Sequence, residues 1–222
     1  MKLPISYGRQ YISDGDIQAV VETLKSDYLT CGPKIPEFEQ AFCEYVHAKY
    51  SVAVCNATAA LHIAAMALGV KEGDNVICTP MTFASSANCI RFCGGNVKFV
   101  DIDPETYLLD INKLKEILST APKGTYKGMV LVDFAGYPHN MEEYRKVADE
   151  YGMWILEDAC HAPGAYFIDS TGERVYCGCG KYSDITVFSF HPVKHITTGE
   201  GGMVCTQNKE YYEKMALYRT HG

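Results

Sequence analysis

The chain has 222 residues, of which 47% are hydrophobic and 21% charged, and its 20 Lys and Arg against 27 Asp and Glu give a formal net charge of −7. This composition is typical of a globular protein and excludes an intrinsically disordered chain. The negative charge argues against binding to nucleic acid or to an anionic membrane surface, so we expect small molecules or proteins as partners.

No apolar run reaches the roughly 18 residues that a membrane span requires, and residues 1–10 lack the apolar core of a signal peptide. We therefore expect a cytoplasmic protein. The ten cysteines lie mostly in apolar segments of a chain that is too long for a disulfide-stapled scaffold. This distribution predicts reduced thiols.

The first 48 residues predict an N-terminal helical segment with two helices. Ser13 or Asp14 can cap a helix that ends at Lys25. A second helix over residues 33–48 has an apolar stripe on one side. The stripe consists of Ile35, Phe38, Phe42, Tyr45 and Val46.

Residues 49–222 alternate helical stretches with short, apolar, β-branched runs, which predicts one larger α/β domain with a mostly parallel sheet and helices on both faces. The predicted strands are residues 51–55, 75–79, 97–102, 129–134, 153–158, 184–190 and 202–206. The predicted helices are residues 56–68, 84–93, 111–118, 141–152 and 208–218, and residues 162–180 form a Gly-rich passage. Ligands of such sheets bind beyond the carboxyl ends of the strands, so the residues after each strand are the candidates for chemistry.

A small-residue turn, Asn56, Ala57 and Thr58, follows the first strand of this domain and opens an Ala-rich helix. Small side chains let an anion approach the backbone, and the free N–H groups of a helix N-terminus attract negative charge. The turn is therefore a candidate phosphate site. An ordinary capped helix would give the same pattern.

Two acids, Glu157 and Asp158, close an apolar strand and are followed closely by His161. Burying a carboxylate is costly unless it is paired, so Asp158 is expected to have a cationic partner. The alternative is an Asp that caps the next segment.

Lys194 lies between two histidines in the stretch SFHPVKH, which follows a predicted strand and precedes TTGEGG. A lysine in a desolvated pocket is an amine nucleophile that can form a Schiff base. The glycines that follow indicate a place where the backbone comes close to a ligand. The alternative is an ordinary surface lysine.

Phe83 follows the strand over residues 75–79 and is placed at the same edge of the sheet. It could cover a flat cofactor ring or be a core residue. Together with the phosphate site, the acid and the amine, it gives the parts needed to bind a planar, phosphorylated aldehyde with a basic ring nitrogen. Pyridoxal phosphate (PLP) fits that description.

Six motifs follow one another along the chain: NATAALHIAAMAL, PMTFASSANCI, DFAGYPHNM, EDACHAPGA, SFHPVKHITTGEGGMV and LYRTHG. In the order and spacing of these motifs, the chain resembles the large domain of the DegT/StrS-type sugar aminotransferases. These are fold-type I PLP enzymes with a three-layer, aspartate-aminotransferase-like domain, and they aminate keto sugars attached to nucleotides. The N-terminal stretch and SFHPVKHITT are similar to the branch that acts on a UDP-linked 4-keto-6-deoxy hexosamine in pseudaminic acid biosynthesis.

The resemblance implies how the reactive parts of the cofactor are held. Lys194 matches the lysine that forms the internal aldimine and then serves as general acid and base. Asp158 matches the carboxylate that pairs with the pyridinium nitrogen and keeps it protonated. Phe83 matches the aromatic residue that stacks on the ring.

The remaining cofactor contacts also follow from the resemblance. Ala57, Thr58 and Ser189 match positions that bind the phosphate. His161 falls where the family has Gln or His near the phenolic oxygen of the ring. The resemblance further implies glutamate as the amino donor, a UDP-sugar as the acceptor and a homodimer with shared active sites.

Family members continue beyond the LYRTHG motif into a smaller C-terminal domain, so we expect that domain to be absent from this chain. Three alternatives stay open. The chain could be a non-catalytic or inactive PLP-fold protein with a regulatory or binding role. A sugar dehydratase would have His in place of Lys194, and the pair Cys177 and Cys179 could bind a metal, although zinc thiolates are usually spaced by two or more residues.

Overall fold

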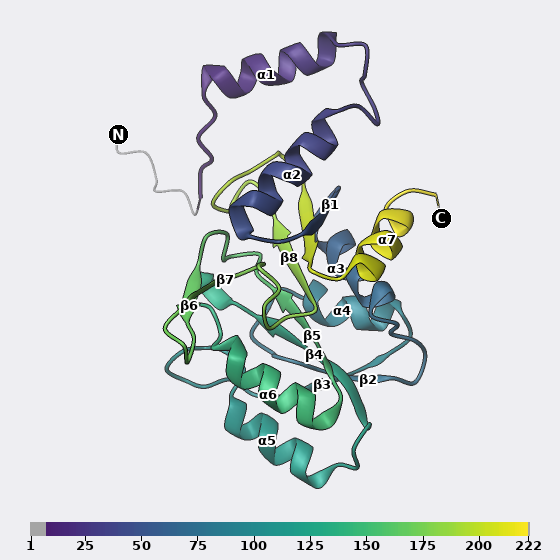
Figure 1. The fold of residues 1–222 in the computed structure, drawn as a ribbon, viewed down its shortest axis with the longest axis vertical. Helices are drawn as coiled ribbons and strands as arrows, with labels where there is room; N and C mark the ends of the chain where they lie inside the picture. Colours follow the sequence, from purple (N-terminus) through teal and green to yellow (C-terminus); the bar gives the residue numbers. More distant parts are fainter. Residues whose placement is uncertain (1–7, 222) are drawn as a thin grey trace, which may run out of the picture.

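The computed structural model describes residues 8–221, and in them the predicted helices form in the expected order (Figure 1). The α-helices are α1 (Asp14–Lys25), α2 (Lys34–Val46), α3 (Ala57–Ala67), α4 (Ser85–Phe92), α5 (Ile111–Thr120), α6 (Met141–Tyr151) and α7 (Lys209–Tyr218). The strands are β1 (Tyr50–Val54), β2 (Asn75–Cys78), β3 (Asn96–Phe99), β4 (Tyr126–Val132), β5 (Trp154–Asp158), β6 (Tyr166–Ile168), β7 (Arg174–Tyr176), β8 (Ile185–Ser189) and β9 (Gly202–Thr206).

Seven of these strands form one sheet in the order β1-β9-β8-β5-β4-β2-β3. Strand β9 runs antiparallel to both of its neighbours, and every other pairing in this sheet is parallel. The α/β class with a mostly parallel sheet is therefore confirmed. Because β1, β2, β4, β5 and β8 run in one direction, the segments that follow them meet at one edge of the sheet.

The sheet is the middle layer of three. Successive strand residues point to opposite faces, and neighbours such as Val130 and Leu131 belong to different core clusters. One cluster contains buried residues of α3, α4 and α7, whereas the other contains buried residues of α5 and α6. Figure 1 shows the two sets of helices on opposite sides of the strands. Helices thus cover both faces, as predicted.

The N-terminal helices differ in how they are packed. Ser13 caps α1 in a capping box with Asp16, as the sequence predicts, but α1 buries no residue and stands away from the rest of the molecule (Figure 1). Helix α2 buries Phe42 and Val46 from its predicted stripe, together with a cysteine. All buried residues of α2 lie in its C-terminal half. Two other members of the predicted stripe are exposed, Ile35 and Tyr45.

Two strand predictions need correction. The Gly-rich passage contains a hairpin, β6 and β7, whose strands of three residues are too short to show an alternating pattern. Strand β3 ends at Phe99 and is largely exposed, because it is the edge strand of the sheet and is not buried on both faces.

Two further findings bear on the sequence predictions. All ten cysteines are free thiols, as predicted. Among the described residues, no helix is long and apolar enough to cross a bilayer.

Candidate active site

A cavity of about 660 Å³ lies at the edge of the sheet where the parallel strands end. Segments that follow β1, β2, β4, β5 and β8 all contribute to its lining. The seven residues predicted to hold a cofactor are among the lining residues: Ala57, Thr58, Phe83, Asp158, His161, Ser189 and Lys194. The topology of the sheet thus brings together side chains that are far apart in the chain. Ala57 and Lys194, for example, line the same cavity.

The N-terminus of α3 opens into this cavity. Asn56 is its N-cap and accepts a hydrogen bond from the Ala59 N–H at 2.9 Å. The preceding N–H groups, those of Ala57 and Thr58, have no acceptor within the helix, as at every helix start. The start of β9 packs tightly behind them, since a Cβ on Gly202 would lie 2.6 Å from the carbonyl carbon of Asn56. This arrangement suits an anion.

Asp158 is the buried charge of the cavity, with 4% of its surface exposed. Its Oδ2 accepts a hydrogen bond from Ser86 Oγ at 2.6 Å, and its Oδ1 accepts one from the Cys160 N–H at 3.2 Å. Within residues 8–221 no Lys, Arg or His side chain forms an ion pair with Asp158, so the expected cationic partner is not a residue of the described chain. The carboxylate therefore offers its charge to whatever occupies the cavity.

Ser86 is a residue that the sequence reasoning missed. It lies in the first turn of α4, is fully buried, and also contacts Thr82 Oγ1 at 2.6 Å. The available signal was its position one helical turn after Phe83 in a segment already singled out. Nothing in the sequence says which of two adjacent serines points inward: Ser85 contacts Thr58 Oγ1 at 2.7 Å, whereas Ser86 contacts Asp158.

His161 is half-buried, and its orientation is set by the loop that follows β4. The Ala135 N–H donates to His161 Nδ1 at 3.2 Å, so Nδ1 acts as the acceptor and Nε2 carries the proton of the neutral ring. Burial and the nearby charge of Lys194 lower the pKa of His161, which favours that neutral form. Ala135, whose N–H makes this bond, has a positive φ of 55°, an unusual conformation for a residue other than glycine.

Lys194 lies in the loop between β8 and β9. The loop is closed at its base, because the Phe190 N–H donates to Gly201 O at 2.9 Å and the Thr198 N–H donates to Phe190 O at 3.1 Å. A turn in which the Lys194 N–H donates to His191 O at 2.9 Å places the lysine on the cavity side. Lys194 is therefore a cavity residue and not an ordinary surface lysine.

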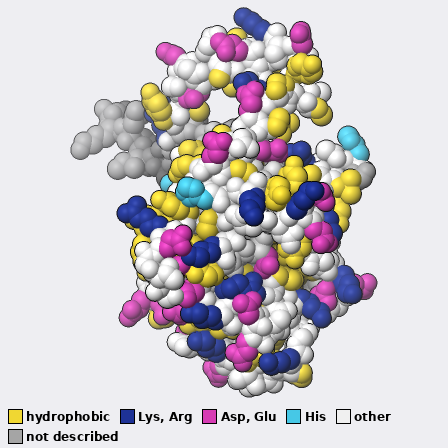
Figure 2. All heavy atoms as spheres, in the orientation of Figure 1, with side chains coloured by type: hydrophobic (Ala, Val, Ile, Leu, Met, Phe, Trp, Pro, Cys, Tyr) yellow, Lys and Arg dark blue, Asp and Glu magenta, His cyan; other side chains and the backbone are white. Residues whose placement is uncertain are grey.

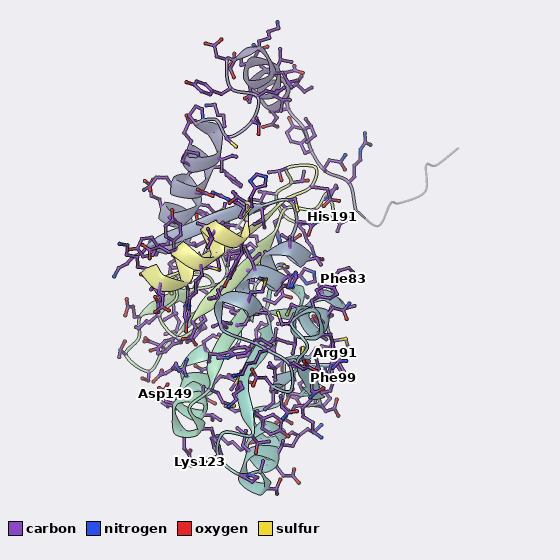
Figure 3. The ribbon with its side chains drawn as sticks, turned by 90° about the vertical axis from the view of Figure 1, so that its right-hand side faces the viewer. Phe83, Arg91, Phe99, Lys123, Asp149 and His191 are labelled. Carbon is purple, nitrogen blue, oxygen red and sulfur yellow. The ribbon has the colours of Figure 1, made fainter. Side chains whose placement is uncertain are left out.

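Phe83 is exposed over 76% of its surface although it lines the cavity. It is therefore not a core residue, which removes the alternative considered from the sequence. Figure 3 shows Phe83 and His191 on the same side of the molecule, at the mouth of the cavity. An exposed aromatic ring there is available to cover a flat ligand.

The possible metal site at Cys177 and Cys179 is not supported by the described residues, in which the two thiols belong to no common group of ligands. Cys177 does not form a site with Cys179; it lies instead beside two buried carboxyl groups.

Comparison with known proteins assigns the chain to a family. Residues 10–222 match the DegT/DnrJ/EryC1/StrS aminotransferase family. The chain is 41% identical over 219 residues to a UDP-4-amino-4,6-dideoxy-N-acetyl-beta-L-altrosamine transaminase of Campylobacter jejuni, covering 98% of this chain and 55% of that protein. The chain thus spans about half the length of the curated relatives that it matches.

Two solved structures have the same fold. PseC of Helicobacter pylori, an aminotransferase involved in the biosynthesis of pseudaminic acid, superposes with a TM-score of 0.88 at 32% identity, covering 98% of this chain and 56% of that one. NtdA of Bacillus subtilis, solved with bound cofactor PMP, superposes with a TM-score of 0.78 at 30% identity, covering 92% and 45%.

Proposed function

Because the chain belongs to the DegT/DnrJ/EryC1/StrS aminotransferase family, we propose that it forms the cofactor-binding part of a PLP-dependent aminotransferase. In this proposal residues 49–222 are the PLP-binding domain and residues 1–48 the N-terminal helical segment. The enzyme transfers an amino group from glutamate to a UDP-linked 4-keto-6-deoxy sugar. One observation carries the proposal: Lys194, the unpaired carboxylate of Asp158 and the start of α3 all line one cavity.

The family uses PLP, and the cavity has a suitable group for each part of that molecule. The buried carboxylate of Asp158, which has no ion partner in the described chain, suits the cationic ring nitrogen. The free N–H groups of Ala57 and Thr58 suit the phosphate, with Ser189 as a further donor. The exposed ring of Phe83 suits the face of the pyridine.

When bound, PLP supplies an aldehyde that condenses with amines and a ring that accepts the electron pair left on a substrate carbon. Lys194 would be the amine that holds the cofactor, and once displaced by a substrate amine it would act as the base and acid that moves the proton of the donor's α-carbon. Asp158 would pair with the ring nitrogen and keep it protonated, and His161, with its proton on Nε2, would be the donor to the phenolic oxygen.

The choice of acceptor is supported by the relatives. The Campylobacter jejuni relative is described as an altrosamine transaminase and the Helicobacter pylori structure as an enzyme of pseudaminic acid biosynthesis. We therefore propose a UDP-linked 4-keto-6-deoxy hexosamine as the acceptor, in the same biosynthetic route. Amination of this acceptor would give the corresponding UDP-linked 4-amino sugar.

We also propose a homodimer with shared active sites. Helix α1 supports this, because it presents Ile17, Val20 and Leu24 to solvent with 53%, 60% and 62% of their surfaces exposed. Apolar side chains in this region are visible on the molecular surface at the top of Figure 2. A second copy of the chain would cover this apolar face.

The experiment that tests the function measures turnover of the UDP-linked 4-keto sugar with glutamate and PLP, for the wild type and for Lys194→Ala. We expect 2-oxoglutarate and the amino sugar to form in equal amounts with the wild type only. Full activity in Lys194→Ala would contradict the assignment. PLP binding without turnover in the wild type would favour the non-catalytic alternative.

A further inference from the structure

A second group of ionisable side chains lies in the core, next to the cavity but not lining it. Asp133 follows β4, Glu157 precedes Asp158 in β5, and Cys177 follows β7. One carboxylate oxygen of each acid and the Cys177 sulfur lie within 4.8 Å of one another. Asp133 is 0% exposed, Glu157 3% and Cys177 4%. None of the three has a role in the proposed reaction.

The hydrogen bonds of the two carboxyl groups leave one oxygen without a donor. Asp133 Oδ1 accepts from the His139 N–H at 3.1 Å and lies 3.0 Å from His139 Nδ1. Glu157 Oε2 accepts from Ser183 Oγ at 2.8 Å and from Thr186 Oγ1 at 2.6 Å. Asp133 Oδ2 is buried and has no hydrogen-bond partner among the described residues. A buried oxygen in this position requires a donor.

Among the described residues, no positively charged side chain donates a hydrogen bond to Asp133 Oδ2. Neither carboxyl group forms an ion pair with a Lys or Arg within residues 8–221. Burial lowers the pKa of His139, so the ring is neutral near pH 7. Burial raises the pKa of Asp133 and of Glu157, and the negative charge of Asp133 raises the pKa of Glu157 further. The two groups cannot both be ionised cheaply at this distance.

We propose that Asp133 and Glu157 share one proton, as a carboxylic acid bound to a carboxylate, and that this pair holds the loop that positions His161. The shared proton gives Asp133 Oδ2 its missing donor. It leaves one negative charge on the pair, which the N–H groups of His139 and the hydroxyl groups of Ser183 and Thr186 stabilise.

The loop of residues 134–139 connects this pair to the cavity. Asp133 binds the far end of the loop at His139. Near its start, the Ala135 N–H donates to His161 Nδ1, and Gly136 packs so closely that a Cβ there would lie 2.7 Å from His161 O. Asp133 is therefore a positioning residue that keeps His161 in the tautomer with the proton on Nε2. The value of that tautomer for the cofactor rests on the proposed function, whereas the shared proton does not.

The shared proton can be tested by unfolding the chain without cofactor in urea, comparing the wild type with Glu157→Gln. Gln can accept from the two hydroxyl groups and donate an amide N–H to Asp133 Oδ2 without holding a titratable proton. The other titratable groups that face the pair are His139, Asp158, Cys177, Cys179 and Cys205. Burial raises the pKa of these three thiols, so they stay neutral through the pH range used.

The sign of the expected effect follows from the raised pKa of the pair. Above the ordinary Glu pKa of 4.5 the unfolded chain has released this proton, whereas the folded chain keeps it. The contribution of the shared proton to the stability of the folded chain is therefore fully present at low pH and is lost as the pH rises. We expect the ratio of the folding constants, wild type over Glu157→Gln, to fall about tenfold per pH unit between about pH 5 and pH 7. Asp169→Asn is the control, since Asp169 is equally buried but pairs with Lys181 at 2.6 Å. A ratio for Glu157→Gln that is independent of pH would overturn the shared proton.

The positioning role is tested by the ¹⁵N shifts of the His161 ring, assigned by comparison with His161→Gln. We expect Nδ1 to be unprotonated in the wild type and in Glu157→Gln, and the two tautomers to mix in Asp133→Ala. Unchanged ¹⁵N shifts of the His161 ring in a folded Asp133→Ala variant would overturn the positioning role of Asp133. A protonated Nδ1 in the wild type would also overturn it. A stoichiometric divalent metal in the purified chain would also overturn the proposal, because the metal would occupy the place of the proton. PLP is absent throughout, so these results are independent of the proposed function.

Discussion

Asp158 shows most clearly how a single residue links the fold to the chemistry. Its carboxylate is almost fully buried, yet its hydrogen-bond donors are a hydroxyl group and an amide, and no charged donor reaches it within the described chain. Desolvation of a carboxylate is unfavourable without a positive charge nearby. The position of Asp158 on the cavity wall therefore indicates a positively charged ligand.

Replacement of this carboxylate should affect catalysis much more than folding. In Asp158→Asn the side chain keeps an oxygen that can accept from Ser86, but it loses the charge that is proposed to hold the cofactor ring nitrogen protonated. We expect transamination to fall by a factor on the order of 10² to 10³, as for other charge-stabilising groups in active sites. The measurement is the turnover rate at saturating PLP, together with circular dichroism.

Glu116→Gln, which neutralises an exposed carboxylate on α5, is the matched control and should leave turnover unchanged. A turnover in Asp158→Asn within a factor of two of the wild type would contradict the role of Asp158.

The sequence could identify the residues of the cavity but not all of their partners. Asp158 ends a strand, and Ala57, Thr58, Phe83 and Lys194 lie in segments that follow strands; a parallel sheet brings these strand ends together. Ser86 was missed because adjacent serines differ only in the direction of their side chains. The cluster of Asp133, Glu157 and Cys177 was missed because it joins three segments whose contact depends on packing in the core.

Among the elements, the helices and the buried strands could be predicted closely, because apolar periodicity and capping residues mark them. The order of the strands in the sheet could not be predicted. Strand β9 runs antiparallel to β8 because the loop that holds Lys194 contains no crossover helix and returns the chain directly to the sheet. The β6–β7 hairpin was missed because its strands of three residues are too short to show an alternating pattern.

Asp169 is the residue that fastens this hairpin. Its Oδ1 accepts from the Glu173 N–H at 3.1 Å, and its Oδ2 accepts from Lys181 Nζ at 2.6 Å and from Tyr182 at 3.1 Å. The hydrogen bond from Lys181 is the main reason that the pKa of Asp169 is lowered. Its contribution to stability is therefore present above the ordinary Asp pKa of 3.8 and is lost as the pH falls below it.

We expect Asp169→Asn to loosen the hairpin and to leave the seven-stranded sheet intact. The substitution removes the charge that the hydrogen bond from Lys181 stabilises, so the hairpin loses part of its support. Amide hydrogen exchange should become faster at Phe167 and Val175, which pair across the hairpin, and stay slow at Val130 in the sheet. Unchanged protection of both hairpin amides would contradict this explanation.

At the scale of the whole molecule, α1 is the element that needs a partner. A helix with no buried residue and an apolar face is poorly stabilised by itself, because most helical stability in proteins comes from tertiary packing. The exposed residues Ile17, Val20 and Leu24 are spaced by three and four positions and therefore lie on one side of α1.

The proposed dimer predicts that charges on this face weaken association. We expect the wild type to have the mass of a dimer by light scattering, and Val20→Glu/Leu24→Glu to raise the dissociation constant at least about tenfold, since burying an unpaired carboxylate is unfavourable. Ala19→Glu, on the opposite face of α1, is the control. A monomeric wild type, or equal dissociation constants for the two variants, would contradict the prediction.

The central claim is that Lys194 is the residue that holds PLP in this cavity, and it is tested most directly by chemical trapping. Wild-type chain and Lys194→Ala are incubated with PLP, reduced with borohydride, digested and analysed by mass spectrometry. We predict one predominant phosphopyridoxyl group, on Lys194, with a visible absorption band that borohydride removes, and neither feature in Lys194→Ala. Labelling that is spread over other lysines and is the same in both chains would contradict the claim.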